Sequence, residues 1–444
     1  MQLRDYQRDV VDRALQVMRT RNIVYLAAEV RTGKNIMSIT IAKELGWRKV
    51  CFITKLNAIP DVEREYANLG QPFSVFVVKN FEQAEKLTNI FDGFIIDESH
   101  SCGAYAKPSK RTKVLRDLIG YSPVILMSGT PSPESLSQLY HQFWITRYGP
   151  WQEYANFYKW AKKYVDVRKR FINGYEINDY SRAYSDKVNA DVEPFMVRVS
   201  QVEAGFTSFV EDVIHYVQID ERMYKLMEHL RKYKVYRLKD GSTIVCDSPV
   251  KLQSAFHQLS SGTLKVGEKR YTFDESKAWY IKTKFAGQKI GIFYKFIQEG
   301  EVLKKVFPNW TDDHQVFNSH NNLVYIKQCV SGREGSNLST ADALVAYNID
   351  FSATTYWQLR ARMQTRDRTK ESKLHFIFSQ EGIERYVYNV VTKKKNFTRQ
   401  YFDKMLKTWN PGSRPELFAT SKNAATSPSR SSAATSTGSR ISSR

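Results

Sequence analysis

The sequence predicts an α/β protein with two parallel-sheet domains in tandem, a helical and hairpin insertion between them, and a disordered C-terminal tail. Short apolar runs rich in β-branched residues alternate with segments of helical apolar spacing, the pattern of a parallel sheet covered by helices on both faces. This alternation stops near residue 150 and restarts near residue 270. We therefore expect domains over 1–150 and 270–409, a connecting region over 151–269 and a tail over 410–444.

The composition favours a globular protein with an anionic partner. The chain has 444 residues, 42% of them hydrophobic, which is enough for buried cores in two or three domains. Its formal net charge is +21. So basic a protein is attracted to polyanions, of which nucleic acid is the commonest. A solvated basic surface without a partner is the alternative.

Cysteine spacing and hydropathy exclude several classes of protein. The four cysteines lie far apart, without a C-x-x-C pair, which argues against a zinc site and a disulfide framework: Cys51, Cys102, Cys246 and Cys329. The first residues lack the apolar core of a signal peptide, and no apolar run reaches the length that spans a bilayer. We expect a soluble intracellular protein without a membrane partner.

The first domain is expected to open with an amphipathic helix, since apolar residues recur at helical spacing from Leu3 to Met18. A strand then begins at Ile23. Further strands are predicted over 50–53, 75–78, 94–97 and 124–127, and helices over 61–69, 81–89 and 112–119. Because the strands alternate with helices, their carboxyl ends should meet at one edge of a parallel sheet.

The connecting region is rich in aromatic and basic residues and is expected to be mostly helical over 151–233. Asp240-Gly241 between 236–238 and 243–245 predicts a hairpin. Second-domain strands are predicted over 290–294, 323–326, 343–347 and 374–378. From residue 410 onward the chain is mainly Ser, Thr, Ala, Pro and Arg. It cannot bury enough surface to offset its ordering entropy, so it is either inert or a source of weak phosphate contacts.

The segment 28–35 carries the first sign of chemistry. It reads Ala-Glu-Val-Arg-Thr-Gly-Lys-Asn, after an apolar strand and before a segment of helical spacing. Backbone N–H groups of such a loop, with the helix N-terminus behind it, favour an anion. Lys34 would add a point charge for the β- and γ-phosphates. Against the phosphate-loop pattern, Ala28 replaces the first glycine and Asn35 replaces the hydroxyl residue that binds Mg²⁺.

Two carboxylates follow the strand at 94–97. In Asp97-Glu98-Ser99-His100, Asp97 can hold Mg²⁺ through its water shell, and Glu98 can orient and deprotonate an attacking water. The alternative is an acidic pair at a helix N-terminus. After the next strand, the small residues from Ser128 to Pro131 would let a loop lie against both carboxylates, although alone they are an ordinary turn.

In this order, these elements resemble superfamily 2 nucleic-acid motors with paired RecA-like domains, most closely the Swi/Snf-type branch and phage-encoded DNA helicases. The resemblance covers roughly residues 1–405. It implies that Gln7 reads adenine while Arg4 and Tyr6 pack against the base. The remaining nucleotide contacts that it implies in the first domain come from the phosphate loop and the Asp-Glu box: Val30, Arg31, Thr32, Gly33, Lys34, Asn35 and Asp97. Asn35 and Asp97 would be the metal ligands.

The resemblance also implies roles further along the chain. Thr54, Lys55 and Asn80 fall in segments that contact or support the nucleic-acid backbone, and Ser128 and Thr130 couple the two sites. In the second domain, Gly332–Leu338 matches motif V. There, Gly332 and Arg333 would contact nucleic acid, and Gly335 and Asn337 nucleotide.

Residues 358–366 resemble motif VI of the same motors. Gln358 would help couple the lobes. Arg362 would be the arginine finger that stabilises charge on the transferred phosphoryl group, with Arg366 as its partner. The alternative for these arginines is a solvated basic helix face.

The segment 159–164 interleaves cations with aromatic residues. Lys159 and Lys163 could grip phosphates while neighbouring rings stack on a base. A solvated helix with an aromatic core face explains the pattern equally well.

The family resemblance implies an ATP-dependent DNA helicase or translocase that uses ATP and Mg²⁺ on duplex, forked or branched DNA, in the host cytoplasm if it is phage-encoded. RNA is the second choice of substrate. An Asn at position 35 would displace Mg²⁺ or its waters, so a hydrolysis-impaired, nucleotide-gated DNA-binding protein is a second hypothesis. The motor subunit of a restriction or defence complex is a third, and it would require protein partners that the sequence does not specify.

Overall fold

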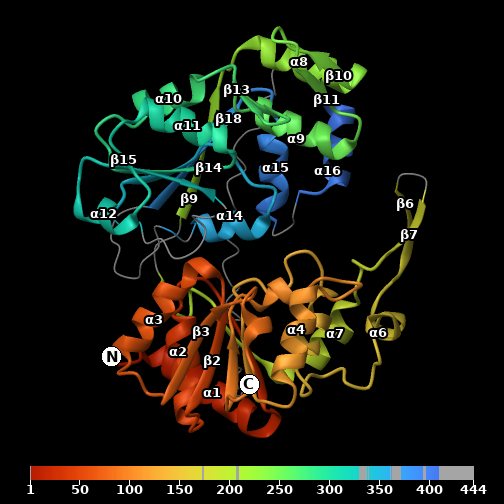
Figure 1. The fold of residues 1–444 in the computed structure, drawn as a ribbon, viewed down its shortest axis with the longest axis vertical. Coiled ribbons are helices and arrows are strands. Elements are labelled where there is room, and N and C mark those ends of the chain that lie inside the picture. Colours follow the sequence, from red (N-terminus) through yellow and green to blue (C-terminus); the bar gives the residue numbers. More distant parts are fainter. Residues whose placement is uncertain are drawn as a thin grey trace, which may run out of the picture.

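The computed structural model describes residues 2–172, 175–206, 210–329, 338, 340–360, 362, 372–393 and 397–409. The expected tail over 410–444 lies outside the described residues. The chain forms two α/β lobes, one stacked on the other, each built around a six-stranded parallel sheet (Figure 1). The predicted α/β class and the two parallel sheets are thus confirmed.

The first lobe is organised by a sheet with the strand order β3-β2-β4-β5-β1-β8. All neighbouring pairs in it are parallel, so the carboxyl ends of its strands lie at one edge. Its strands are β1 (Ile23–Ala28), β2 (Lys49–Thr54), β3 (Val75–Asn80), β4 (Gly93–Ile96), β5 (Val124–Met127) and β8 (Met196–Val199).

Helices cover both faces of this sheet. They are α1 (Asp5–Arg21), α2 (Lys34–Glu44), α3 (Ile59–Asn68), α4 (Lys110–Ile119), α5 (Gln138–Trp144), α6 (Phe157–Tyr164) and α7 (Ser185–Val192), with short 3₁₀ turns η1 (Leu56–Ala58), η2 (Ala84–Lys86), η3 (Ser99–Cys102) and η4 (Glu193–Phe195). A hairpin of β6 (Arg168–Ile172) and β7 (Tyr175–Asp179) projects from this lobe (Figure 1).

The second lobe repeats the plan, with the strand order β15-β16-β14-β17-β18-β9. Neighbouring pairs are again parallel. Its strands are β9 (Val210–Val217), β14 (Ile290–Tyr294), β15 (Trp310–Thr311), β16 (Val324–Gln328), β17 (Ala343–Ala346) and β18 (Ser372–Ser379).

The second lobe also carries two antiparallel hairpins, β10 (Val235–Arg237) with β11 (Thr243–Val245) and β12 (Thr263–Val266) with β13 (Lys269–Thr272). The hairpin predicted around Asp240-Gly241 is confirmed. The helices of this lobe are α8 (Glu221–Tyr233), α9 (Pro249–Leu259), α10 (Ser276–Lys284), α11 (Ile297–Val306), α12 (His314–Ser319), α14 (Ala353–Arg360), α15 (Glu384–Val391) and α16 (Arg399–Thr408).

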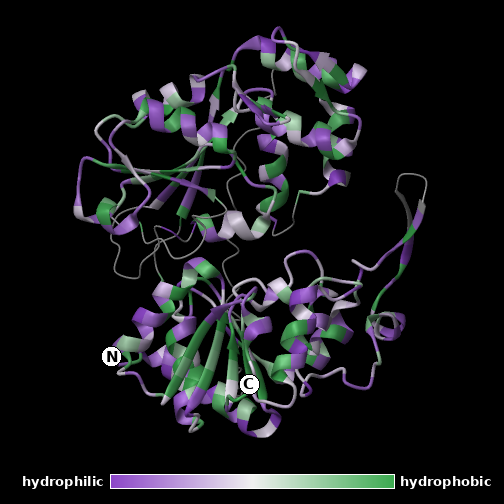
Figure 2. Ribbon diagram, viewed as in Figure 1, coloured by the Kyte–Doolittle hydropathy of each residue, from purple (hydrophilic) through white to green (hydrophobic). Residues whose placement is uncertain are grey.

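Burial on both faces explains why the sheet strands read as continuous apolar runs. Along β1, Ile23 and Tyr25 pack into one core, while Val24 and Leu26 pack into another on the opposite face. The second sheet likewise separates two cores. Figure 2 shows the hydrophobic residues concentrated in the strands and the hydrophilic residues on the outer faces of the helices.

Two predictions about secondary structure are wrong. The segment 81–89 is no helix: Phe81 and Ala84 are buried, but only the short turn η2 forms there. The stretch 151–233 is not mostly helical, since it contains the β6–β7 hairpin and one edge strand of each sheet, β8 and β9. β8 and β9 are strands because they pair with partners that are distant in the sequence, whereas β6 and β7 are neighbours in the sequence and pair with each other.

Among the described residues, no helix combines the length and the apolar character that crossing a membrane requires.

Candidate active site

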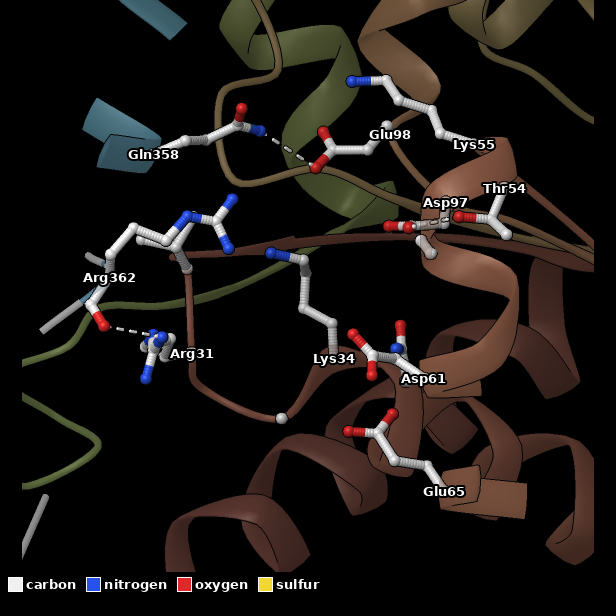
Figure 3. A pocket seen from close by; sticks show the side chains of 14 residues that line it. Arg31, Lys34, Thr54, Lys55, Asp61, Glu65, Asp97, Glu98, Gln358 and Arg362 are labelled. Carbon is white, nitrogen blue, oxygen red and sulfur yellow. Dashed lines mark hydrogen bonds between the residues drawn. The ribbon is translucent and has the colours of Figure 1, made fainter. Parts of the chain in front are cut away.

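A cleft at the carboxyl edge of the first sheet is lined by residues of both lobes (Figure 3). Segments after β1, β2 and β4 line it from the first lobe, and α14 with the turn that follows lines it from the second. The lining residues are Val30, Arg31, Gly33, Lys34, Asn35, Thr54, Lys55, Ala58, Asp61, Glu65, Asp97, Glu98, Gln358 and Arg362. Eleven of them were singled out from the sequence or its resemblance, and the three that were not are Ala58, Asp61 and Glu65.

The loop before α2 requires glycine at position 33. Gly33 has φ +81°, in the left-handed region, and a Cβ there would lie 2.3 Å from Gln7 Nε2. The Gln7 amide and the Tyr6 hydroxyl both donate to the Thr32 carbonyl, at 3.3 and 3.1 Å. The backbone N–H of Arg4 donates to Gln7 Oε1 at 3.1 Å. The predicted base-reading glutamine is therefore buried and supports the loop.

Lys34 is the first residue of α2, so its side chain and the helix N-terminus share the cleft. Its Nζ donates to the Ala28 carbonyl at 3.2 Å. A Cβ on Gly129 would lie 3.6 Å from this Nζ. The Ser-Gly-Thr-Pro loop thus lies within van der Waals range of the lysine amine.

Asp97 is buried at the end of β4, where its Oδ2 accepts a hydrogen bond from Thr54 Oγ1 at 2.8 Å. Burial, followed by the negative charge of Glu98, raises the pKa of Asp97 to about 6, against the opposing charge of Lys34. Thr54, expected at the nucleic-acid backbone, is fully buried and orients this carboxylate instead. Lys55 likewise lines the cleft.

Glu98 has a strained backbone and a well-defined set of partners. Its φ of +49° is unusual for a residue with a side chain. Its Oε2 lies 3.0 Å from His100 Nδ1, and its Oε1 accepts from Gln358 Nε2 at 3.3 Å. Burial acts to raise the pKa of Glu98, but the hydrogen bond from His100 and the charges of His100, Lys55 and Lys34 outweigh it, so the pKa lies below its ordinary value.

A polar network runs from Glu98 to the loop after β5. His100 Nδ1 also lies 2.9 Å from Ser128 Oγ, which accepts from the Thr130 backbone N–H at 3.1 Å. This network connects the predicted coupling residues Ser128 and Thr130 to Glu98, the predicted general base.

A second, buried branch of polar contacts was not predicted from the sequence. Ser99 Oγ donates to Tyr25 OH at 2.8 Å, Tyr25 donates to Gln142 Oε1 at 2.7 Å, and Gln142 Nε2 donates to the Pro131 carbonyl at 2.7 Å. The Asp-Glu box and the Ser-Gly-Thr-Pro loop are thus joined by two routes.

The second lobe contributes Gln358 and Arg362, from α14 and the turn after it. The Arg362 side chain faces Lys34 across the cleft (Figure 3). The Arg362 carbonyl accepts a hydrogen bond from Arg31 Nη2 at 3.0 Å. The other expected second-lobe residues lie outside the described residues: Gly332, Arg333, Gly335, Asn337 and Arg366.

Asn35 lines the cleft beside two carboxylates of α3, Asp61 and Glu65. Burial raises the pKa of Glu65, opposed by a hydrogen bond with Asn35. A carboxylate accepts, so the Asn35 amide N–H donates, which leaves its carbonyl oxygen as the group that could bind a metal. The carboxylates are four residues apart on one helix, a spacing visible in the sequence.

The remaining predicted nucleic-acid residues lie away from the cleft. Asn80 is buried, and its Oδ1 accepts from the Gln83 backbone N–H at 2.9 Å, so it shapes a turn. Lys159 and Lys163 lie on the exposed face of α6. Trp160 and Tyr164 are buried on the other face. The aromatic rings therefore belong to the core and are not available to stack on a base.

Comparison with models of known protein families and with curated proteins gives no match to this chain.

Proposed function

We propose that this protein is an ATP-driven DNA motor of the superfamily 2 type, with two RecA-like lobes. One observation carries the proposal: Lys34, Asp97 and Glu98 of the first lobe share a cleft with Gln358 and Arg362 of the second. A phosphate-binding lysine, paired carboxylates and a trans-cleft arginine are the parts that phosphoryl transfer requires. Duplex, forked or branched DNA is the favoured substrate, and RNA is the second choice.

The residues of the cleft fit a triphosphate. The α2 N-terminus, Lys34 and Arg362 place positive charge around one volume, which Gly33 lines without a side chain. Asp97, with the carbonyl oxygen of Asn35, offers hard oxygen ligands for Mg²⁺, which when bound would neutralise charge on the phosphates.

The groups around Glu98 fit a water molecule. Its low pKa leaves the carboxylate ionised, so that it can accept a hydrogen bond from a water and orient it. Gln358 donates to this carboxylate, and its own Oε1 is buried without a hydrogen-bond partner among the described residues. A water donating to both acceptors would be oriented by one residue from each lobe. Hydrolysis would then depend on cleft closure, as a motor requires.

The basic surface supports a nucleic-acid partner, and α6 offers a test of where it binds. We expect the double substitution Lys159→Glu and Lys163→Glu to weaken DNA binding by roughly tenfold or more and to reduce the slope of log affinity against log salt by about two. Fluorescence anisotropy with labelled duplex DNA over a salt series measures both. Lys43→Glu with Lys49→Glu is the matched control, since these exposed lysines carry the same charge change away from α6. An equal loss in both pairs would remove α6 from the DNA-binding surface.

Asn35 favours a second candidate, a nucleotide-gated DNA-binding protein with impaired hydrolysis. A threonine hydroxyl places one oxygen at the metal without a longer amide behind it. We therefore expect Asn35→Thr to raise the rate of phosphate release by about tenfold. Stopped-flow detection of phosphate gives the rate. Asn35→Ala is the control, because alanine has neither the amide of asparagine nor the hydroxyl of threonine. An unchanged rate in the threonine variant would show that position 35 does not limit turnover.

The experiment that tests the proposal is phosphate release measured with single-stranded, duplex, forked and four-way DNA, and with RNA of matched length. We expect forked or duplex DNA to stimulate release more than RNA. Retained DNA affinity without release above background would favour the nucleotide-gated binding protein. A motor subunit of a restriction or defence complex would instead copurify with a partner in a pull-down from its host.

A further inference from the structure

Arg31 has an unusual backbone conformation for a residue with a long side chain. Its φ is +65°, in the left-handed region. The other described non-glycine residues with positive φ are Asn22, Gln71, Glu98 and Lys234. Asn22 and Lys234 close the C-termini of α1 and α8, whereas Arg31 closes no helix. Glycine would adopt this conformation without strain, so an arginine at this position has a backbone cost that glycine would avoid.

The Arg31 side chain reaches the other lobe. Its Nη2 donates to the Arg362 carbonyl at 3.0 Å, a contact that links positions 331 residues apart. Figure 3 shows the guanidinium beside this carbonyl and apart from Lys34. Burial lowers the pKa of Arg31 to about 10, so the group remains a cation at neutral pH. A hydrogen bond from a charged donor in a shielded place is strong and directional.

The acceptor is the backbone carbonyl of Arg362, whose side chain faces Lys34 in the cleft. The Arg362 backbone N–H donates to the Leu359 carbonyl at 3.0 Å, and its carbonyl also accepts from the Leu338 N–H at 3.3 Å. The turn is thus anchored to its own lobe at both peptide groups. Arg31 adds the contact with the phosphate loop, and so determines where Arg362 lies relative to Lys34.

We propose that Arg31 is a positioning residue that sets Arg362 across the cleft, and that it does not bind the nucleotide. The inference rests on the proposed function. It differs from the role that the resemblance implied, in which Arg31 contacts nucleotide. Arg31 acts through the Arg362 backbone, so its loss should affect the rate of the phosphoryl step and the closure of the lobes, with little effect on nucleotide affinity.

The test uses the full chain with Arg31→Gly, Arg31→Lys, Arg362→Ala and the double variant Arg31→Gly/Arg362→Ala. We expect Arg31→Gly to lower kcat by about 10- to 100-fold while the Kd for ATP changes by less than about threefold. Arg31→Lys should recover part of this loss, because an ammonium can still donate to the carbonyl. In the Arg362→Ala background, Arg31→Gly should cost less than about twofold further.

A second readout does not depend on turnover. The four native cysteines are all buried, so dyes can be attached at Lys113→Cys on α4 and Glu301→Cys on α11, both exposed positions. We expect a non-hydrolysable ATP analogue to shorten the distance between the dyes, and Arg31→Gly to reduce this change by half or more.

The outcomes separate the two proposals. A wild-type chain that neither binds nucleotide nor changes the dye distance would overturn the proposed function. Wild-type closure with an Arg31→Gly chain that closes equally, or with multiplicative effects of the two substitutions, would overturn the positioning role alone. A loss of ATP affinity of about tenfold, as expected for Lys34→Ala, would show that Arg31 binds the nucleotide directly.

Discussion

Replacing Glu98 by glutamine is expected to lower nucleic-acid-stimulated ATP hydrolysis by about 100- to 10 000-fold. Although burial acts to raise its pKa, the hydrogen bond from His100 and the surrounding cations keep the carboxylate ionised. Glutamine preserves the shape and the acceptor facing Gln358, but it cannot take a proton from water. Phosphate release at saturating ATP and DNA measures the effect, and the Kd for ATP should change by less than about threefold.

Glu65→Gln is the matched control for Glu98→Gln, because Glu65 is a second carboxylate in the same cleft. It lies on α3, whereas Gln358 and His100 contact Glu98, so we expect the loss of Glu65 to cost less than about tenfold. If Glu98→Gln kept more than about a tenth of the activity, another group would be the base. Equal losses in both variants would indicate a general electrostatic effect of the cleft.

Loss of the buried ion pair in the second lobe should have the largest effect on stability. Lys277 Nζ lies 2.5 Å from Glu384 Oε1, and both side chains are almost fully buried, with exposures of 1% and 0%. The Glu384 carboxylate also accepts from Ser379 N and Oγ. Lys277→Met would leave this carboxylate buried without its cation, so we expect the free energy of unfolding to fall by about 3–5 kcal/mol. Urea titration followed by tryptophan fluorescence measures it.

Two comparisons make the stability prediction specific. Lys277→Met combined with Glu384→Gln should recover part of the loss, because a neutral amide is less costly to bury than a lone carboxylate. Lys225→Met breaks an exposed pair with Glu221 on α8 and should cost about 0–0.5 kcal/mol. A cost below about 1 kcal/mol for Lys277→Met would mean that water reaches Glu384, against the burial described above.

Much of the fold could be predicted because the central strands are buried on both faces. Their apolar runs at 50–53, 124–127 and 290–294 are short and bounded by polar residues or proline, and each is a strand in the structure. The β6–β7 hairpin was missed although the sequence carries a signal for it, Asn173-Gly174 between its two strands. The high content of aromatic and basic residues in this region favoured a helical prediction instead.

The edge strands were harder to predict because their identity depends on distant partners. β9 pairs with β18 along its whole length, from Val210 opposite Ser372 to Val217 opposite Ser379. Its sequence carries acidic residues and a histidine, so local hydropathy alone did not mark a buried strand. The pairing across more than a hundred residues supplies the hydrogen bonds that stabilise it.

In the candidate site, too, some residues could be predicted from the local sequence, and contacts with distant partners could not. Lys34, Asp97 and Glu98 could be predicted, because each follows a strand whose carboxyl end meets the others. The contacts of Arg31 with Arg362 and of Gln358 with Glu98 could not, since they depend on how the two lobes meet. The hydrogen bond of Thr54 to Asp97 could not be predicted either, because the position of Thr54 at the end of β2 does not reveal where its hydroxyl is directed.

The most direct test of the central claim is the rate of ATP hydrolysis with and without duplex DNA, for the wild-type chain and for Lys34→Ala. Lys43→Ala, an exposed lysine of the same helix, is the control. We expect DNA to stimulate wild-type release by about tenfold or more, Lys34→Ala to abolish release, and Lys43→Ala to retain it. Release that is independent of DNA, or that persists in Lys34→Ala, would contradict the proposed function.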